Sequence, residues 1–237
     1  MNNIIIFGHT WITRHLIKNL LEINSKPKLV IAMPASKSNN ISGYLDLKKF
    51  LKSHEIECYN PESYSLKNDN DIKYLENITF DFALVLGWSR LIPSKIIKKA
   101  KKAVLGVHGG PYPPPRCRGR AVFNWALIDG FKSFYLYIFK ITSGIDDGEI
   151  YIKRKIKITK LDNIESIYDK HSVISTKMFI YVLKNWEQYR KNGVKQDEYK
   201  ATYMPQRTPD HSGICWEDST EKVYNFVRAL AKPFPNA

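Results

Sequence analysis

The chain has 237 residues, 43% of them hydrophobic and 13% aromatic, enough to bury one large domain or one domain with a small appendage. Its net charge is +14, but 28 of the 37 basic residues are lysines spread along the whole chain. We therefore expect a solvated positive surface and no nucleic-acid partner, although such a surface favours an anionic small-molecule substrate.

The three cysteines are Cys58, Cys117 and Cys215, an odd number with no C-x-x-C pair, which argues against a disulfide framework and against a zinc site. No signal sequence precedes the first strand, and no apolar run approaches the roughly 20 residues that a membrane span needs. We expect a cytoplasmic protein with no metal and no membrane contact.

The first third of the chain alternates strand and helix patterns. Residues 3–8 and 28–33 are typical of buried strands, and Thr10 caps a helix between them. A helix at 44–54 and a short strand at 56–59 follow. This opening predicts an α/β fold with a doubly wound, mostly parallel, Rossmann-like sheet. Its first turn holds a single glycine, Gly8, in place of G-x-G-x-x-G, so no dinucleotide is expected.

The remaining elements complete this sheet and add a tail. Residue patterns predict strands at 80–87 and 104–108, helices at 94–101 and 120–128, an antiparallel hairpin at 133–141 and 149–158, and a long helix at 163–190. Residues 191–200 are polar and typical of a linker. We expect a catalytic domain at 1–190 and, at 191–237, a linker with a small C-terminal appendage for substrate binding or packing. The hydrophobic strands around Tyr135 and Tyr151 suggest pairing into a homodimer.

The most informative stretch runs from Val104 to Ile150. A strand delivers His108 to a turn rich in glycine and proline, and Asp146 follows later in an Asp-Asp-Gly loop. A histidine at a strand end, with a carboxylate available later in the chain, is how α/β enzymes place an acid–base pair. The alternatives are a histidine that caps a loop and a plain turn at 146–148.

These residues also resemble a known family. The segments HGGPYPPPRCRG (108–119), WALIDG (125–130) and DDGEI (146–150) look like the core of the folate-dependent formyltransferases. Segments 207–216 and 224–237 most resemble the nucleotide-sugar branch of that family. Its members, which include methionyl-tRNA formyltransferase and glycinamide ribonucleotide formyltransferase, pass the formyl group of N10-formyltetrahydrofolate to an amine.

The resemblance implies roles for particular residues. His108 would accept the proton of the attacking amine, and Asp146, the first residue of Asp-x-Gly, would orient it and relay protons. The cofactor-binding residues implied for the pterin slot are Leu86, Gly87, Trp88, Arg90, Leu91 and Gly144. The expected substrate-binding residues are Gly109, Tyr112, Arg116, Arg118, Asn124, Arg207, His211 and Trp216. Arginine forks among them suit phosphate oxygens, and aromatic rings suit a base.

One position departs from the family pattern. The family has Asn-x-His, with the asparagine amide polarising the formyl oxygen, whereas this chain has Gly106-Val107-His108. Losing one such donor costs on the order of 10²–10³ in rate. A backbone N–H group, a water molecule in the space left by the side chain, or Asn124 could replace it; otherwise the activity is reduced or lost.

The expected function is formylation of a nucleotide-linked amino sugar, with a dTDP-linked 4-amino-4,6-dideoxyhexose (or the 3-amino isomer) as acceptor, for surface polysaccharide such as O-antigen. One alternative is a methionyl-tRNA formyltransferase-like enzyme, which predicts a further C-terminal β-barrel for which the chain leaves no room. A second is a catalytically silent folate- or nucleotide-binding protein, because of Gly106. A basic RNA-binding domain is disfavoured, because its aromatic residues lack the expected strand pattern.

Overall fold

A computed structural model describes residues 3–39 and 41–233; the ends of the two expected parts, at residues 1–2 and 234–237, lie outside this range. Within the described residues, a sheet of seven strands has the order β3-β2-β1-β4-β5-β7-β8. The chain divides into two compact units. The first unit is Met1–Val107 with Phe139–Gly148, and the second is His108–Ile138 with Glu149–Ala237. The strands β5 (Ala100–Gly110) and β7 (Ser133–Lys140) each run from one unit into the other.

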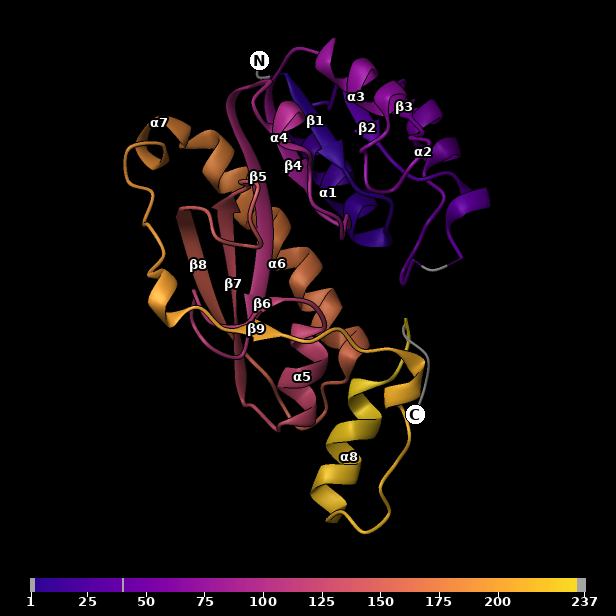
Figure 1. The fold of residues 1–237 in the computed structure, drawn as a ribbon, viewed down its shortest axis with the longest axis vertical. Helices are drawn as coiled ribbons and strands as arrows, with labels where there is room; N and C mark the ends of the chain where they lie inside the picture. Colours follow the sequence, from indigo (N-terminus) through magenta and orange to yellow (C-terminus); the bar gives the residue numbers. More distant parts are fainter. Residues whose placement is uncertain (1–2, 40, 234–237) are drawn as a thin grey trace. The chain divides into compact units, whose positions relative to one another are not determined.

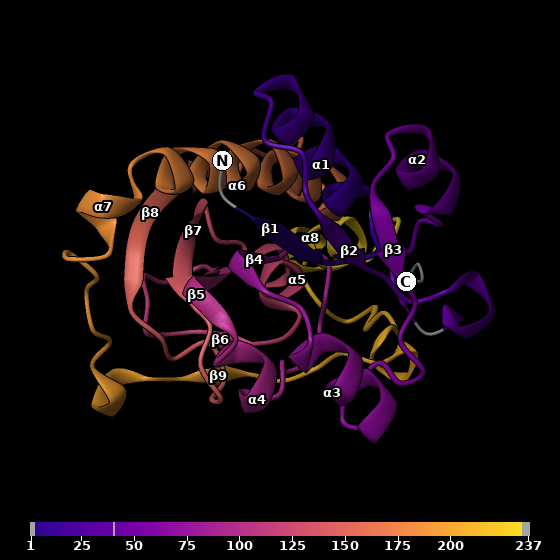
Figure 2. The ribbon, with the colours of Figure 1, turned by 90° about the horizontal axis from the view of Figure 1, so that it is seen from above.

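The first unit is the doubly wound, parallel α/β part that the sequence predicts. Its strands β1 (Ile4–Phe7), β2 (Leu29–Ile31), β3 (Glu57–Tyr59), β4 (Phe80–Val85) and the start of β5 pair in parallel. The flanking helices are α1 (Trp11–Glu22), α2 (Lys48–Ser53), α3 (Asp69–Glu76) and α4 (Ser94–Ile97). Helix α1 lies on one face of these strands, while α3 and α4 lie on the other (Figure 2).

The first helix shows how local sequence fixes an element. The Thr10 hydroxyl accepts from the Thr13 N–H group while the Thr13 hydroxyl accepts from the Thr10 N–H group, so both form a capping box. The apolar positions Leu16, Ile17 and Leu20 are fully buried. The predicted cap is therefore confirmed, and the Thr13 hydroxyl also donates to the Leu86 carbonyl at 2.7 Å, which ties α1 to the end of β4.

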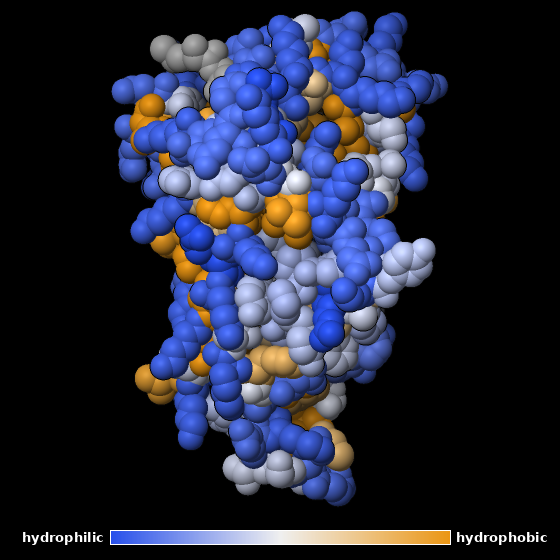
Figure 3. Space-filling view, turned by 90° about the vertical axis from the view of Figure 1, so that its left-hand side faces the viewer, coloured by the Kyte–Doolittle hydropathy of each residue, from blue (hydrophilic) through white to orange (hydrophobic). Residues whose placement is uncertain are grey.

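The second unit holds the remaining elements. They are β6 (Arg118–Gly119), α5 (Val122–Ile128), β8 (Ile150–Lys157), α6 (Ile164–Lys184), α7 (Trp186–Tyr189), β9 (Tyr203–Met204) and α8 (Thr220–Ala229). Figure 1 shows α8 packed against α5, and β9 beside β6. On β8 the lysines are exposed while Ile152 and Ile156 are buried, as the period-two pattern predicts. The side of the molecule that carries β8 and α7 is largely hydrophilic (Figure 3).

Three predicted helices differ in extent from the structure, and one helix was not foreseen. The helix predicted at 44–54 is only Lys48–Ser53, and α3 was not foreseen in its polar segment. The helix predicted at 94–101 ends at Ile97, because Ala100 already pairs with Phe80 as the first residue of β5. The long helix is broken at Asn185, which caps α6 and whose amide donates to the Tyr181 carbonyl at 2.8 Å.

Because two histidines are buried, we predict that the free energy of unfolding depends on pH. Burial lowers the pKa of His9 to about 4. Burial also lowers the pKa of His171 to about 4, with a smaller contribution from the charge of His108. Each therefore binds its proton more readily in the unfolded chain, so the free energy of unfolding falls as the pH drops from about 6.5 towards 4. Urea unfolding at pH 7 and pH 5 measures this loss.

The variant His171→Phe tests the assignment. It keeps an aromatic ring against Phe123 and Tyr168 but removes one of the two titrating groups. We expect a smaller difference between the unfolding free energies at pH 7 and pH 5 than in the unsubstituted protein. An unchanged difference would show that His171 does not carry the effect.

Candidate functional site

The segment that follows β4 carries most of the residues expected to bind the cofactor. Leu86 and Trp88 are buried, and Gly87 between them has φ +79°, a left-handed conformation in which an added Cβ would lie 2.2 Å from the Thr10 hydroxyl oxygen. Glycine is therefore required at this turn. Arg90 stacks on the Tyr64 ring at 4.9 Å, while Leu91 is 52% exposed.

Trp88 belongs to the hydrophobic core of the first unit. Its ring contacts Phe7, His9 and Tyr64, with centroid distances of 5.9, 5.2 and 4.8 Å. Its indole N–H group is buried, and no hydrogen-bond partner for it exists among the described residues. The sequence did not decide whether Trp88 belongs to the core or to the cofactor pocket. In the structure its ring has core contacts, and its N–H group is an unsatisfied donor.

The loop after β7 holds the Asp-Asp-Gly sequence. The Thr142 hydroxyl donates to the Asp147 carboxylate and accepts from the Gly144 N–H group at 3.1 Å. An added Cβ on Gly144 would lie 1.9 Å from Asp147 Oδ2, so this glycine allows the carboxylate to close the loop. Asp147 is thus used within the loop, whereas Asp146 has φ +50°, a left-handed conformation that aspartate tolerates better than most residues.

Gly106 also belongs to the first unit. An added Cβ there would lie 2.5 Å from Ile141 Cδ1 and 3.1 Å from Phe139 Cε1. The Ile141 side chain therefore takes up part of the space in which a water molecule, one of the three alternatives, could have replaced the asparagine amide of the family.

His108 lies in the second unit, inside β5. The strand continues to Gly110, so the expectation that a turn begins at His108 was wrong by two residues. Gly109 makes this continuation possible, since an added Cβ would lie 2.4 Å from the Tyr135 carbonyl oxygen. His108 Nε2 lies 2.8 Å from the Cys117 carbonyl oxygen, and its ring meets Tyr137 edge to face at 5.7 Å.

Cys117 supplies only its backbone to this contact. Burial raises the pKa of the Cys117 thiol, which disfavours the thiolate and hence a cysteine nucleophile beside His108. The imidazole therefore remains the group of this loop that is suited to acid–base chemistry.

The arginines of the same loop differ in their surroundings. Arg116 is exposed and stacks on the Tyr112 ring at 5.2 Å, so it presents a cation next to an aromatic face. Arg118 is fully buried, and its guanidinium donates to both Glu198 oxygens at 2.6 and 2.7 Å and to Gln196 Oε1 at 3.0 Å. The expectation that Arg118 binds substrate does not fit this arrangement, because its fork is already occupied by protein acceptors.

Asn124 does not fit its expected role either. It is 3% exposed in α5, and its amide nitrogen donates to the Ala229 carbonyl at 2.8 Å. This hydrogen bond joins α5 to α8, and together with its burial it holds the Asn124 amide between these two helices and not at the surface of a site.

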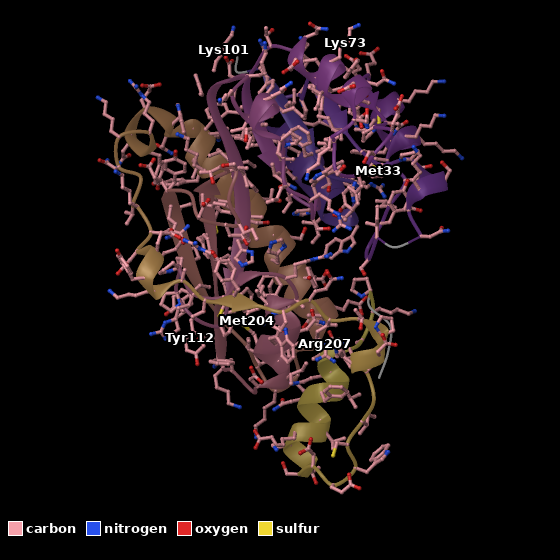
Figure 4. The ribbon with its side chains drawn as sticks, viewed as in Figure 1. Met33, Lys73, Lys101, Tyr112, Met204 and Arg207 are labelled. Carbon is pink, nitrogen blue, oxygen red and sulfur yellow. The ribbon has the colours of Figure 1, made fainter. Side chains whose placement is uncertain are left out.

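The tail residues predicted to bind substrate lie in the second unit. The Arg207 guanidinium is 5.0 Å from the Trp125 ring centroid and 5.4 Å from that of Phe226, and it donates to the His211 carbonyl. Figure 4 places Arg207 after Met204 on the segment that carries β9. His211 Nδ1 accepts from the Thr208 N–H group at 3.0 Å, and Trp216 is 76% exposed.

The sequence missed several partners of these groups. Nothing in the pattern indicated that Glu198 and Thr202 contact the loop after β5, since Glu198 lies within the predicted linker and Thr202 directly follows it. The one available signal was an acidic residue in a lysine-rich stretch. His9 was also missed, although its position directly after β1 places it at the carboxyl edge of the parallel strands.

Within residues 3–39 and 41–233, no helix is long and apolar enough to span a bilayer. No group of three or more histidine, cysteine, aspartate or glutamate side chains in that part of the chain is arranged to hold a metal ion.

Known proteins resemble this chain in sequence and in fold. The family model described as formyl transferase matches residues 2–183. The methionyl-tRNA formyltransferase of Thermodesulfovibrio yellowstonii is 29% identical over 241 residues, covering 100% of this chain and 75% of that enzyme.

Solved structures share the fold at lower identity. A sugar N-formyltransferase from Shewanella sp. has a TM-score of 0.71 at 17% identity, over 100% of this chain and 92% of its own. The N-formyltransferase from Helicobacter canadensis, solved with folinic acid and dTDP-3-aminofucose, has a TM-score of 0.70 at 16% identity, over 100% and 84%.

Proposed function

Because this chain belongs to the formyl transferase family, we propose that it moves the formyl group of N10-formyltetrahydrofolate to the amine of a nucleotide-linked amino sugar. The observation that carries the proposal is the retained pair of reactive residues in their family motifs. His108 lies near the end of β5, and Asp146 lies in the Asp-Asp-Gly loop, where it has φ +50°. As an enzyme of this class, the chain is a formyltransferase.

In the proposed reaction, His108 and Asp146 have different roles. The amine nitrogen attacks the formyl carbon, the bond from that carbon to N10 breaks, and tetrahydrofolate leaves. His108 accepts the proton that the amine loses, Asp146 stabilises the charged imidazole, and N10 takes up a proton as it leaves. The formyl donor supplies the activated one-carbon group, and the chain supplies proton transfer and position.

The segment after β4 fits a flat heteroaromatic ring. The buried indole N–H group of Trp88 has no partner among the described residues, and Leu91 presents an exposed apolar side chain. Such rings are bound by apolar walls and a few hydrogen bonds, so Leu86, Gly87, Arg90 and Gly144 would contribute mainly shape and backbone groups.

Three features support a nucleotide sugar as the acceptor. The exposed Arg116 next to Tyr112 suits a diphosphate, and Trp216 presents a ring face to solvent. The likeness to the Shewanella sugar N-formyltransferase extends over the whole of this chain, and the Helicobacter canadensis structure contains a dTDP-amino sugar. A dTDP-4-amino-4,6-dideoxyhexose for surface polysaccharide, a cytoplasmic location and a homodimer belong to the same proposal.

The second candidate is formylation of methionyl-tRNA. The sequence identity to the Thermodesulfovibrio yellowstonii enzyme and the net charge of +14 favour it. A panel of dTDP- and UDP-linked 3-amino and 4-amino sugars, with initiator methionyl-tRNA as a further acceptor, separates the two. We expect one amino sugar to be formylated and the tRNA to be ignored at physiological salt, where non-specific tRNA binding weakens. Formylation of the tRNA alone would reverse the choice.

A substitution at Gly106 is predicted to increase the activity. The double variant Gly106→Asn with Ile141→Val restores the amide donor and removes the Cδ1 atom that lies 2.5 Å from the new Cβ. We expect its kcat to rise about tenfold or more above that of the unsubstituted enzyme, since one oxyanion donor is worth on the order of 10²–10³. Steady-state kinetics with the best amino sugar measure this.

The single variants are its controls. Ile141→Val alone should leave kcat unchanged, and Gly106→Asn alone should gain less than the pair, because the Ile141 side chain must move to admit the amide. A double variant no faster than Ile141→Val would show that the formyl oxygen is already fully stabilised by other groups.

A further inference from the structure

The second unit presents a row of lysines on the exposed face of its sheet. On β8, Lys153, Lys155 and Lys157 are exposed, and they alternate with residues that include the buried Ile152 and Ile156. Side chains two residues apart in a strand lie on the same face, roughly 7 Å from one another. We call Lys153, Lys155 and Lys157 the lysine row.

The charges of the lysine row are not neutralised by the protein. Among residues 3–39 and 41–233, no carboxylate forms an ion pair with any of the three, in contrast to Lys170, which binds Asp162 at 2.6 Å. The other face of β8 is covered by α6 (Figure 2). Three uncompensated ammonium groups thus face solvent on one side of this strand, which favours an anionic ligand there.

The lysine row lies on the same face of the sheet as His108. Lys155 Nζ is 5.8 Å from the ring centroid of Tyr135 on β7, the strand between β8 and β5. Tyr137 follows Tyr135 by two residues and therefore shares its face, and its ring meets that of His108 at 5.7 Å. These contacts connect the ammonium of Lys155 to the imidazole across one surface.

The direction of the strands places Lys153 nearest to His108. The loop between β7 and β8, from Lys140 to Ile150, is too short for a parallel crossover, so the two strands run antiparallel. A step along β7 towards Tyr137 is thus a step along β8 from Lys155 towards Lys153. Because β8 is two strands from β5, the backbones of Lys153 and His108 are roughly 10 Å apart.

A second cation is held in the same way near the start of β7. The Arg116 guanidinium is 5.2 Å from the centroid of the Tyr112 ring, which meets the Phe131 ring at 5.1 Å, two residues before β7 begins at Ser133. The Lys155–Tyr135 and Arg116–Tyr112 pairs therefore lie along the same stretch of chain. A cation over an aromatic ring is ordered but still exposed, which suits it to phosphate oxygens.

We propose that the lysine row, with Lys155 at its centre, binds the diphosphate of the nucleotide-linked acceptor and thereby directs the amine of its sugar towards His108. The diphosphate is attached to C1 of the hexose, whereas the amine is on C3 or C4, across the ring. An amine at His108 thus leaves the diphosphate about one sugar ring away, on the side where the row can reach it. The proposal rests on the proposed function for the identity of the acceptor, and it adds the sheet face to Arg116 as a source of positive charge.

The first experiment needs no amino sugar. Isothermal titration calorimetry measures the binding of inorganic pyrophosphate to the unsubstituted protein, to Lys155→Gln and to a variant with glutamine at all three positions of the row. We expect Lys155→Gln to weaken binding roughly three- to fivefold, the range of one exposed charge pair, and the triple variant to weaken it about tenfold or more. Added salt should weaken binding to the unsubstituted protein, because exposed charges are screened.

The control tests whether any exposed lysine would have the same effect. Lys177 is exposed on α6, which covers the other face of β8, and Lys177→Gln should bind pyrophosphate as the unsubstituted protein does. The proposal is overturned if the unsubstituted protein does not bind pyrophosphate, or if the triple variant binds it no more weakly than Lys177→Gln. Neither result depends on whether the chain formylates a sugar.

The second experiment measures catalysis with the best amino sugar of the panel. We expect Lys155→Gln to raise the KM of the acceptor roughly three- to fivefold while kcat and the KM of the formyl donor stay unchanged, because the row contacts the diphosphate and not the reacting atoms. Lys155→Arg, which keeps the charge, should restore the KM of the acceptor. All three lysines are exposed, so the variants should fold, and thermal unfolding checks this.

Two kinetic results would contradict the proposal. An unchanged KM of the acceptor in the triple variant would mean that the row is only a solvated surface. A higher KM of the formyl donor, with that of the acceptor unchanged, would mean that the row binds the glutamate carboxylates of the folate and not a diphosphate. If no amino sugar is formylated at all, the proposed function fails, while the pyrophosphate titration still decides whether the row is an anion site.

Discussion

Replacing His108 with asparagine is expected to lower kcat/KM for formyl transfer by about 10²–10⁴-fold, the range that a general base contributes. Asparagine fits the space of the imidazole, but its amide nitrogen superposes on Nδ1 and does not reach the Cys117 carbonyl, which His108 Nε2 contacts at 2.8 Å, so thermal unfolding of the variant is measured as a check on its fold. What it lacks is a basic lone pair for the amine proton. Steady-state kinetics, together with a binding measurement for the formyl donor, check both parts of this expectation.

The control is a histidine outside the site. His15 lies on α1, where its ring is near Asn19, and His15→Asn should leave kcat/KM unchanged. Undiminished turnover by His108→Asn would remove the imidazole from the mechanism.

Replacing Asp146 with asparagine is expected to lower kcat by about 10²-fold or more, with little change in the KM of the formyl donor. The carboxylate is needed to stabilise the imidazolium that forms when His108 takes up the proton, and a neutral amide cannot do so. Asparagine tolerates the left-handed conformation of residue 146, at φ +50°, so the backbone loses nothing.

Asp147→Asn is the matched comparison, one residue away. Asp147 accepts from the Thr142 hydroxyl and packs against Gly144, so its loss should loosen the loop and affect thermal stability more than kcat. If Asp147→Asn lost as much kcat as Asp146→Asn, or more, the assignment of the two carboxylates would have to be exchanged.

The α/β fold could be predicted because its signals are local. The run Ile4–Phe7 is apolar throughout and Phe80–Val85 is apolar except at Asp81, as is typical of strands covered on both faces, and Thr10 marks a helix start by its own hydrogen bond. Where the apolar pattern was weak, as at Asp69–Glu76, no helix was foreseen, although the Asn68 side chain caps it by accepting from the Asp71 N–H group. Polar capping carries less information in a sequence than an apolar run.

The site could be predicted only as a set of residue types. The motif around His108 and Asp146 indicates which groups can react, but a motif does not state which neighbours have already used their hydrogen bonds. Arg118 and Asn124 looked like binding groups and proved to be bound by Glu198 and by the Ala229 carbonyl. These partners lie 80 and 105 positions away in the chain, so only the tertiary structure could reveal them.

The order of the predicted linker could not be foreseen for the same reason. Residues 191–200 have the polar composition of a linker, yet Val194 pairs with Ile150 and Glu198 closes on a buried arginine. A buried charge and two backbone pairings hold this segment, and composition registers neither.

The most direct test of the account is a single-turnover experiment with N10-formyltetrahydrofolate carrying a ¹³C-labelled formyl group. The enzyme, in excess over the donor, is mixed with the amino-sugar nucleotide panel, and the products are analysed by mass spectrometry. The account predicts that the labelled group appears as a formamide on one amino sugar, and that His108→Asn leaves it on the folate. Label that remains on the folate with every acceptor, or that moves equally well without His108, would contradict the central claim.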